Sequence, residues 1–236
     1  MRIKIIVAYD GTHFLGSQQQ KETTNTIIGQ LHKVFKQLGI ESKIVASGRT
    51  DKGVHASGQV CHIDLPPFWS DIKKLKRVIN RMLPSSILIK EIKKVNDNFH
   101  ARYSAKKRLY RYILKDQESN PFEGNFVTFL EDIDFSTIEK NIKLFQGVHD
   151  FSYFLKTGSD EKSTVREIYS AFAYKHNAYI VLHFEANGFL RSQIRLMVGA
   201  LLHLNKAQII EKLSLKQNYK LKPAPSNGLY LARIRY

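Results

Sequence analysis

Apolar residues at helical spacing predict two helices in the first half of the chain. The first follows Thr24 or Asn25, either of which can cap it, and ends at Gly39, because glycine favours the left-handed conformation that terminates helices. Its apolar face comprises Ile27, Ile28, Leu31, Val34, Phe35 and Leu38. The second helix covers about 70–82 and ends before Pro84.

Two more helices are predicted in the second half. One opens with the capping box Ser136–Glu139, in which each side chain accepts from the other's backbone N–H, and it ends at Gly147. The other covers about 189–204 and is mostly apolar. Its length and composition are typical of a helix packed against a core.

Eight segments are rich in β-branched residues or alternate apolar with polar positions, which predicts strands. They are 2–9, 43–47, 59–65 and 86–95 in the first half, then 108–115, 165–175, 178–186 and 229–236. Together with the helices, the predicted order is β-α-β-β-α-β, repeated once along the chain. No sequence repeat is visible, so the duplication is one of pattern only.

This order predicts an α+β fold of two ferredoxin-like, RRM-like βαββαβ units. We expect antiparallel sheets that lie side by side with a cleft between them, since sites often form between domains. Residues 1–100 then form an N-terminal domain and residues 101–236 a C-terminal domain, with the junction near 96–106.

The composition is that of a soluble globular protein, with 236 residues of which 43% are hydrophobic and 25% charged. A single cysteine, Cys61, excludes an internal disulfide and a cysteine-based metal cluster, and its strand position predicts a buried, unreactive thiol. We find no signal peptide, and the apolar stretch 194–204 is far shorter than the roughly 18 residues that span a bilayer. We therefore expect a cytoplasmic protein without a membrane anchor.

The charge points to a polyanionic partner. The net charge is +16, and the stretch from Lys73 to Lys115 holds fourteen Lys or Arg against two acids. Residues 116–139 hold seven acids and no Lys or Arg. A solubilising surface would explain part of this pattern, but such concentration of positive charge is typical of nucleic-acid binding.

Several chemistries lack their motifs. The chain has no Gly-rich dinucleotide fingerprint, no phosphate-binding P-loop and no Gly-x-Ser-x-Gly nucleophile elbow. The nine histidines are scattered, and paired acids of the two-metal type are not apparent. We therefore expect no bound metal and no small-molecule cofactor.

The loop of residues 46–55 carries the strongest candidate chemistry. Asp51 is the only acid between Glu41 and Asp64, and Arg49 lies two residues before it. A turn aspartate that binds its own backbone is one interpretation, and a functional carboxylate is the other. The local sequence alone leaves both open.

A family resemblance decides between them. Gly48-Arg-Thr-Asp-Lys-Gly-Val-His55, followed by Gly58-Gln-Val60, closely resembles the catalytic loop of the TruA family of tRNA pseudouridine synthases. Further matches follow in the family's order along nearly the whole chain, at 8–12, 14–18, 98–105, 108–112, 147–151, 187–190, 194–199 and 228–231.

The resemblance implies roles for three residues. Asp51 is the nucleophile that detaches uracil from its ribose, and a carboxylate suits an anomeric centre with oxocarbenium character. Attack at C1′, formation of a glycal and stabilisation of charge all remain open. Arg49 is expected to stabilise the ionised carboxylate and to fill the space of the flipped base. Tyr110 is expected to contact the target base, although a strand tyrosine is more often a core residue.

The remaining site residues are basic. Arg195 lies in an apolar helix and so needs a partner, which the resemblance implies is Asp51; snorkelling to solvent is the alternative. Arg191, four residues earlier, is expected on the same helix face. Lys107, Arg108 and Arg111 are expected to contact RNA phosphates.

The implied activity is conversion of uridine to pseudouridine at positions 38, 39 and 40 of the anticodon stem-loop of tRNA, by a homodimer. Three departures from the family pattern bear on RNA docking, namely Ser17 in place of a tryptophan, Thr26-Ile-Ile28, and Arg191-Ser-Gln193. The rival interpretations are an RNA-binding protein without activity, a metal-dependent nuclease, and the same chemistry at other uridines.

Overall fold

A computed structural model describes residues 1–20, 22–156, 158 and 161–236. Within this part of the chain, the mixed α+β class is confirmed. The finer expectation of two ferredoxin-like units around a cleft stays a prediction.

The chain forms two compact units. Unit 1 comprises Met1–Lys106 and Leu231–Tyr236, and unit 2 comprises Lys107–Tyr230. The last six residues therefore belong with the N-terminal part of the chain, which the predicted division into 1–100 and 101–236 did not include.

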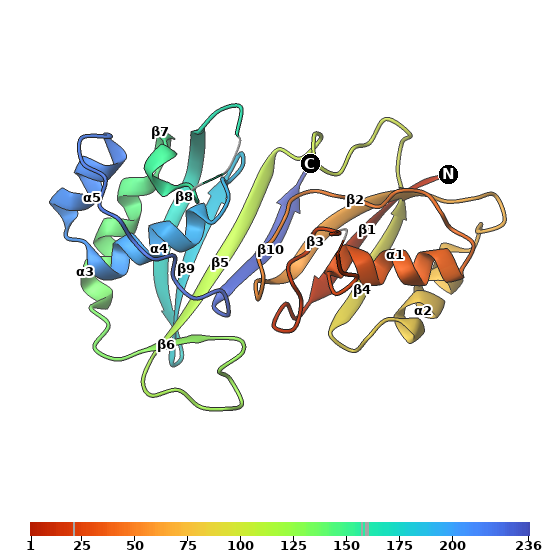
Figure 1. Ribbon diagram of the computed structural model, residues 1–236, viewed down its shortest axis with the longest axis horizontal. Coiled ribbons are helices and arrows are strands. Elements are labelled where there is room, and N and C mark those ends of the chain that lie inside the picture. Colours follow the sequence, from red (N-terminus) through yellow and green to blue (C-terminus); the bar gives the residue numbers. More distant parts are fainter. Residues whose placement is uncertain (21, 157, 159–160) are drawn as a thin grey trace. The chain divides into compact units, whose positions relative to one another are not determined.

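The sheet of unit 1 is centred on β1 (Arg2–Tyr9). β1 pairs antiparallel with β3 (His55–Asp64) on one side and with β4 (Ile87–Lys94) on the other (Figure 1). The short β2 (Val45–Ala46) pairs antiparallel with β3, and β10 (Leu229–Arg235) adjoins β3 as well.

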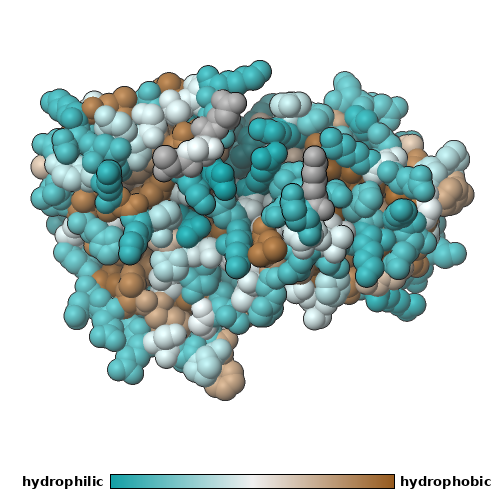
Figure 2. Space-filling view, in the orientation of Figure 1, coloured by the Kyte–Doolittle hydropathy of each residue, from teal (hydrophilic) through white to brown (hydrophobic). Residues whose placement is uncertain are grey.

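Strict alternation along β1 creates the core of unit 1. Ile3, Ile5, Val7 and Tyr9 are buried, whereas the residues between them are partly exposed. Two helices, α1 (Ile27–Gln37) and α2 (Ile72–Met82), bury their apolar faces in the same unit. In Figure 2, hydrophilic side chains cover most of the visible surface over these two helices.

The cap of α1 lies later than predicted. Thr26, rather than Thr24 or Asn25, is the N-cap, and its side chain accepts from the backbone N–H of Gly29. The predicted end is confirmed, because Gly39 adopts a φ of +72° just after the helix.

The sheet of unit 2 joins β5 (Lys107–Asp116) to β9 (Tyr179–Ala186), then to β8 (Val165–His176) and β7 (Gly147–Asp150). These pairs are antiparallel. A further short strand, β6 (Thr128–Leu130), pairs parallel with β5. The pattern of the sequence did not predict β6 or β7, which have only three and four residues.

The helices of unit 2 differ most from expectation. They are α3 (Phe135–Asn141), the 3₁₀ turns η1 (Ile142–Phe145) and η2 (Ser152–Phe154), α4 (Gln193–His203) and α5 (Lys206–Leu213). The capping box at Ser136 was wrong: Asp134 caps α3 by accepting from the backbone N–H of Thr137 at 3.1 Å. Among the described helices, none has the length and hydropathy needed to cross a membrane.

The unpredicted α5 is held in place by a buried lysine. Lys212 is 1% exposed, and its Nζ donates to Asn218 Oδ1 at 2.6 Å and to the carbonyl oxygen of Tyr219 at 2.8 Å. The ammonium also lies over the ring of Phe154, 5.1 Å from its centroid. Burial lowers the pKa of Lys212 to about 8.

We expect this lysine to make stability depend on pH. Below pH 8 both folded and unfolded chains carry the charge, so the folded state bears the full cost of burying it. Between about pH 8 and 10.5 the folded chain releases the proton first, so the free energy of unfolding rises with pH, by on the order of 3 kcal/mol. Urea unfolding at several pH values should show this rise in the wild type and not in Lys212→Met; parallel curves would contradict it.

Candidate active site

The loop that carries Asp51 joins β2 to β3 within unit 1. Its ends are tied to β3, because Ser47 N–H donates to Val60 O at 2.8 Å and the side-chain amide of Gln59 donates to Gly48 O at 2.8 Å. The turn itself closes with a bond from Val54 N–H to Asp51 O at 3.2 Å. Asp51 is half-buried at this turn.

Thr50, the residue before Asp51, is held on three sides. Its backbone N–H donates to Ser17 Oγ at 2.8 Å, and its carbonyl oxygen accepts from Ser17 N–H at 3.1 Å. Its hydroxyl lies 2.8 Å from the hydroxyl of Tyr9. All three residues are less than 9% exposed, so these bonds are shielded from water and fix the backbone beside Asp51.

The segment that supplies Ser17 approaches the loop closely through two glycines. A Cβ on Gly11 would lie 2.0 Å from Val54 O, and one on Gly16 would lie 3.0 Å from Thr50 O. Gly16 also has a φ of +101°, which L side chains rarely adopt. His55 Nδ1 accepts from Gly11 N–H at 3.0 Å and joins the same two segments.

Arg49 lies on the exposed side of this loop. Its Nε donates to Gln18 Oε1 at 3.2 Å. Gln18 directly follows Ser17, so the segment that holds the backbone of Thr50 also orients this arginine.

In unit 2, alternation along β5 divides the predicted substrate contacts between two faces of the sheet. Arg108 and Tyr110 share the face of Tyr112, whereas Lys107 and Arg111 lie on the opposite face. The prediction grouped these basic residues as RNA contacts without separating them. The structure places only Arg108 on the same sheet face as Tyr110.

The face with Tyr110 is largely buried. Tyr110 is 8% exposed, and its ring meets Phe189 edge to face, with the centroids 5.3 Å apart. Arg108 is half-buried and its Nη1 donates to the carbonyl oxygen of Asn187 at 2.6 Å. Asn187 and Phe189 belong to the segment between β9 and α4, so this segment packs beside the predicted base contact.

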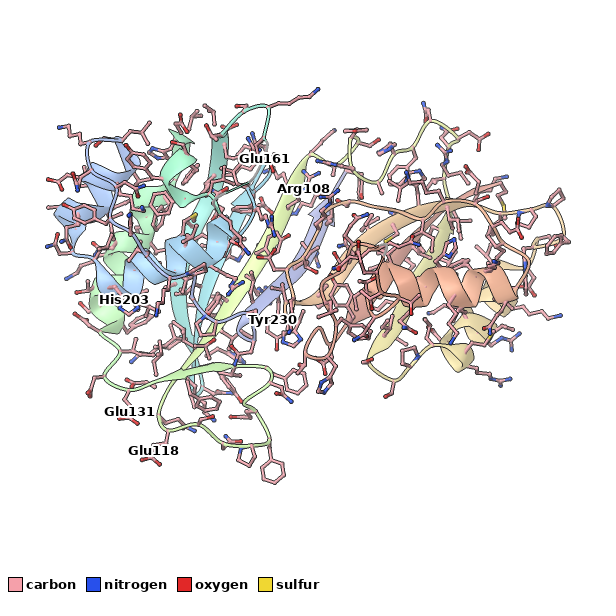
Figure 3. The ribbon with its side chains drawn as sticks, viewed as in Figure 1. Arg108, Glu118, Glu131, Glu161, His203 and Tyr230 are labelled. Carbon is pink, nitrogen blue, oxygen red and sulfur yellow. The ribbon has the colours of Figure 1, made fainter. Side chains whose placement is uncertain are left out.

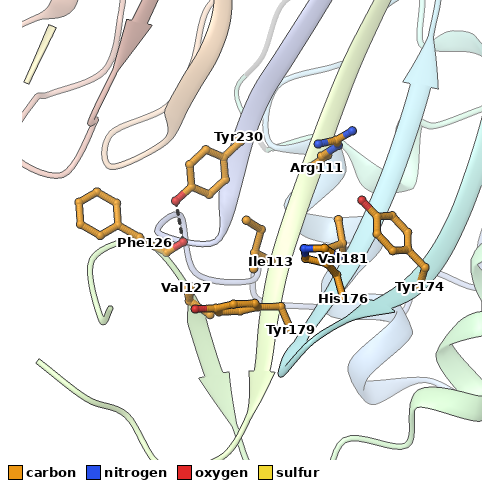
Figure 4. A pocket seen from close by; sticks show the side chains of 9 residues that line it. All are labelled: Arg111, Ile113, Phe126, Val127, Tyr174, His176, Tyr179, Val181 and Tyr230. Atoms are coloured by element: carbon orange, nitrogen blue, oxygen red, sulfur yellow. Dashed lines mark hydrogen bonds between the residues drawn. The ribbon is translucent and has the colours of Figure 1, made fainter. Parts of the chain in front are cut away.

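The opposite face is lined by aromatic residues around a hollow of about 480 Å³. Arg111 lines this hollow with Tyr174, Tyr179 and Tyr230 (Figure 4). The hydroxyl of Tyr230 donates to Phe126 O at 2.7 Å.

Lys107 is engaged on this face as well. Its Nζ lies 3.4 Å from Glu185 Oε1 and 4.6 Å from the ring centroid of Tyr169.

Arg191 and Arg195 do not both lie in α4, where they were expected to share one face. Arg195 lies in the first turn of α4, and its Nε donates to Ala224 O at 2.6 Å. Arg191 precedes the helix, because Ser192 adopts a φ of +60° and α4 begins only at Gln193. The expectation that both arginines share one helix face was therefore wrong.

Charge changes sign at the end of β5. Arg108 lies near its start, whereas Glu118 and Glu131 lie on the loops beyond its end (Figure 3). Also near this end, Lys115, Tyr179 and Asn120 donate to Glu123 and lower its pKa to about 2. Within unit 2, the end that carries the predicted substrate residues is thus the more basic one.

The sequence raises two further kinds of reactive site, a free thiol and a metal centre. Burial raises the pKa of the Cys61 thiol to about 12, as the predicted unreactive thiol requires. In the described part of the chain, no group of three or more His, Cys, Asp or Glu is placed to hold a metal ion.

Sequence reasoning missed how the Asp51 loop is supported. The sequence presents Ser17 only as a departure from the family pattern, and Tyr9 and Thr50 only as parts of motifs. The available signal was a polar hydroxyl at the last buried position of β1, which had to find a partner.

Comparisons with known proteins identify the family. A family model described as tRNA pseudouridine synthase matches residues 5–104 and 142–236, so that β5 with Tyr110 lies between the matched segments. A tRNA pseudouridine synthase A of Campylobacter jejuni (strain RM1221) is 39% identical over 100% of both chains. A tRNA pseudouridine synthase A 1 of Bacillus cereus is 37% identical over 100% of this chain and 98% of its own.

A solved structure, a Cbf5–Nop10–Gar1 complex, aligns with 97% of this chain and 48% of its own, at 12% identity and a TM-score of 0.43, which by itself does not establish a shared fold. The family match covers most of the chain, and the relatives match it from end to end. The chain therefore belongs to the tRNA pseudouridine synthase family, whose members are isomerases.

Proposed function

We propose that this protein converts uridine to pseudouridine at positions 38, 39 and 40 of the anticodon stem-loop of cytoplasmic tRNA, with Asp51 as the nucleophile. The observation that carries the proposal is the buried anchoring of the backbone beside Asp51 by Ser17 and Tyr9. A turn aspartate with a purely local role would need no such support from two distant segments. The family membership supplies the reaction class.

The reaction exchanges one bond to the ribose for another. The bond from C1′ to N1 of uracil breaks, the base rotates, and a bond from C1′ to C5 forms. C5 then loses its proton and N1 gains one, so the change is an isomerisation. A carboxylate can capture or stabilise the electron-poor C1′ during the rotation, and Asp51 supplies it.

The target base must leave its stack, at a cost of a few kcal/mol. Tyr110 is the proposed contact for the flipped base, with Phe189 packed against its ring. Arg49 is proposed to fill the vacated position, and Arg195 to pair with Asp51. Among the phosphate contacts, Arg108 has the support of sharing a sheet face with Tyr110.

Lys107, Arg111 and Arg191 remain proposed phosphate contacts. The first two lie on the opposite face of β5, which is also the face proposed below to join two copies, so they are proposed to hold phosphates of an RNA that bridges both copies. Arg191 lies in the exposed turn before α4. Phosphate contacts position an RNA without reading its sequence, so each is expected to contribute to affinity and little to the choice of uridine.

We also propose that the enzyme is a homodimer. Tyr169 and Phe172 on β8 are 40% and 38% exposed, and Phe172 stacks on His183 with the centroids 4.3 Å apart. Exposed aromatic residues on a sheet face are typical of protein interfaces. A second copy of this face would cover them.

The first test is release of tritium from tRNA that carries 5-tritiated uridine, with EDTA present throughout. The wild type should release tritium. Asp51→Asn should release none, although it should bind tRNA as tightly as the wild type does. Asp71→Asn is the matched control, because Asp71 caps α2 and asparagine caps helices equally well.

Each rival predicts another result of this assay. Tight binding without release by the wild type would favour the RNA-binding protein. Cleavage of the tRNA that occurs with Mg²⁺ and is lost in EDTA would favour the metal-dependent nuclease. Mapping the pseudouridines would show whether other positions are modified.

The second test addresses the support of the loop. Ser17→Ala leaves the buried N–H of Thr50 unpaired, so we expect the free energy of unfolding to fall by about 1–3 kcal/mol. We expect kcat to fall roughly 10- to 100-fold with little change in KM, because the nucleophile is displaced.

Ser47→Ala is the matched control for Ser17→Ala. Ser47 is also buried, but its hydroxyl has no hydrogen-bond partner among the described residues. This change should leave kcat intact and leave stability equal or higher. Equal kcat values for the two variants would contradict a role of Ser17 in positioning Asp51.

The third test concerns the proposed dimer. Phe172→Glu places a charge on the exposed aromatic face and should convert the dimer to monomers in sedimentation experiments. Phe122→Glu is the control, because Phe122 is 89% exposed and lies outside this sheet. An unchanged dimer in Phe172→Glu would place the interface elsewhere.

A further inference from the structure

An exposed aromatic side chain of unit 1 has no role in the proposed chemistry. Tyr103 lies in the segment between β4 and β5, drawn in yellow-green in Figure 1, and it is 78% exposed. Exposing so much of a tyrosine gains no burial energy for the fold.

Tyr103 is the outer end of a series of aromatic rings. Its ring stacks on His100, with the centroids 4.4 Å apart and the planes at 28°. The ring centroids of His100 and His62 lie 5.0 Å apart, and those of His62 and Phe99 lie 6.2 Å apart. Because His62 is buried, the series connects the exposed ring to the core of unit 1.

The backbone beneath Tyr103 is fixed by hydrogen bonds. The N–H groups of Arg102 and Tyr103 both donate to His100 Nδ1 at 3.2 Å. His100 N–H donates to Ser104 Oγ at 3.1 Å, and Ser104 N–H donates to His100 O at 2.9 Å.

Ala101, within the same turn, is tied to the core. Its N–H donates to the Nδ1 of the buried His62 at 3.1 Å. Each residue from 100 to 104 therefore has its N–H bonded, so the turn loses little conformational freedom when a ligand binds.

A positive charge lies beside this ring, and a second lies within the same aromatic cluster. The guanidinium of Arg102 lies 5.9 Å from its centroid, and Lys4 lies 5.7 Å from the centroid of Tyr236, which contacts Phe99 in the same cluster. The segment also belongs to the stretch from Lys73 to Lys115, with fourteen Lys or Arg against two acids. An aromatic face among cations is the arrangement that binds unpaired nucleotides, by stacking and by attraction to phosphate.

We propose that Tyr103, supported by His100, is a stacking platform for an unpaired base of the RNA substrate. This site is additional to the catalytic loop, and the inference rests on the proposed function in that the ligand is RNA. Arg102 holds the adjacent phosphate. The platform contributes to affinity and leaves the isomerisation itself unchanged.

The test is equilibrium binding of unmodified tRNA, of a single-stranded RNA and of a blunt RNA duplex of equal length, in EDTA and over a series of salt concentrations. Tyr103→Leu should weaken binding of tRNA and of the single strand about 5- to 150-fold, as expected when one stacked base is lost. Tyr103→Phe should bind like the wild type. The duplex should bind equally to all variants.

Salt separates stacking from charge. Tyr103→Leu should leave the slope of log Kd against log salt unchanged, whereas Arg102→Gln should reduce it by about one. Phe122→Leu, a change at another exposed aromatic residue, should alter neither affinity nor slope. In Tyr103→Trp, indole fluorescence should be quenched on binding the single strand.

Three outcomes would overturn the proposal. In the first, Tyr103→Leu binds the single strand as tightly as the wild type does, and in the second it loses as much affinity for the duplex as for the single strand. In the third, a change in the oligomeric state of Tyr103→Leu in sedimentation makes Tyr103 a contact between copies. Tritium release at saturating tRNA is measured separately. A wild type that binds RNA but releases no tritium would refute the proposed activity. The stacking platform would still be tested by the binding measurements.

Discussion

The buried hydrogen bonds around Thr50 are the constraint on which the candidate site depends. The Ser17 hydroxyl accepts from the backbone N–H of Thr50, and the Ser17 N–H donates to the carbonyl oxygen of Thr50. Tyr9, at the end of β1, is hydrogen-bonded to the Thr50 hydroxyl. An unpaired buried group costs about 1–3 kcal/mol, so the three segments must assemble together. Gly11 and Gly16 permit this approach, because any larger residue would collide with the loop. The position of Asp51 relative to β1 and α1 is therefore set before RNA binds.

Alternation along β5 gives the sheet of unit 2 two different faces. One face of β5 carries Tyr110 and Arg108 beside the segment that leads into α4, and the other carries Lys107 and Arg111 with the exposed aromatic residues. Side chains of successive residues point to opposite faces, so one strand presents the proposed base contact on one side and, on the other, two proposed phosphate contacts beside exposed aromatic residues. The acids beyond the end of β5 would repel phosphate there, which favours the proposed phosphate contacts near its start.

Both polar loops of unit 1 are made rigid by the same device. In the Asp51 loop a serine hydroxyl and a tyrosine hydroxyl satisfy the backbone and side chain of Thr50, and in the Tyr103 turn the rings of His100 and His62 accept backbone N–H groups. Such loops hold a geometry without a large apolar core of their own. In the proposed mechanism the enzyme holds an extruded base, and order in the free protein reduces the entropy lost on binding.

The sequence by itself determined eight of the ten described strands and the apolar face of α1, because their periods are local properties, and its ordered motifs determined the candidate role of Asp51 through the family resemblance. It placed the cap of α1 too early and the start of α4 before Arg191, since capping depends on a few side-chain bonds and on the φ of Ser192. Only the tertiary structure decided that Ser17 supports Thr50 and that His100, on which Tyr103 stacks, contacts the buried His62. These relations join residues far apart in the chain, and no local pattern encodes them.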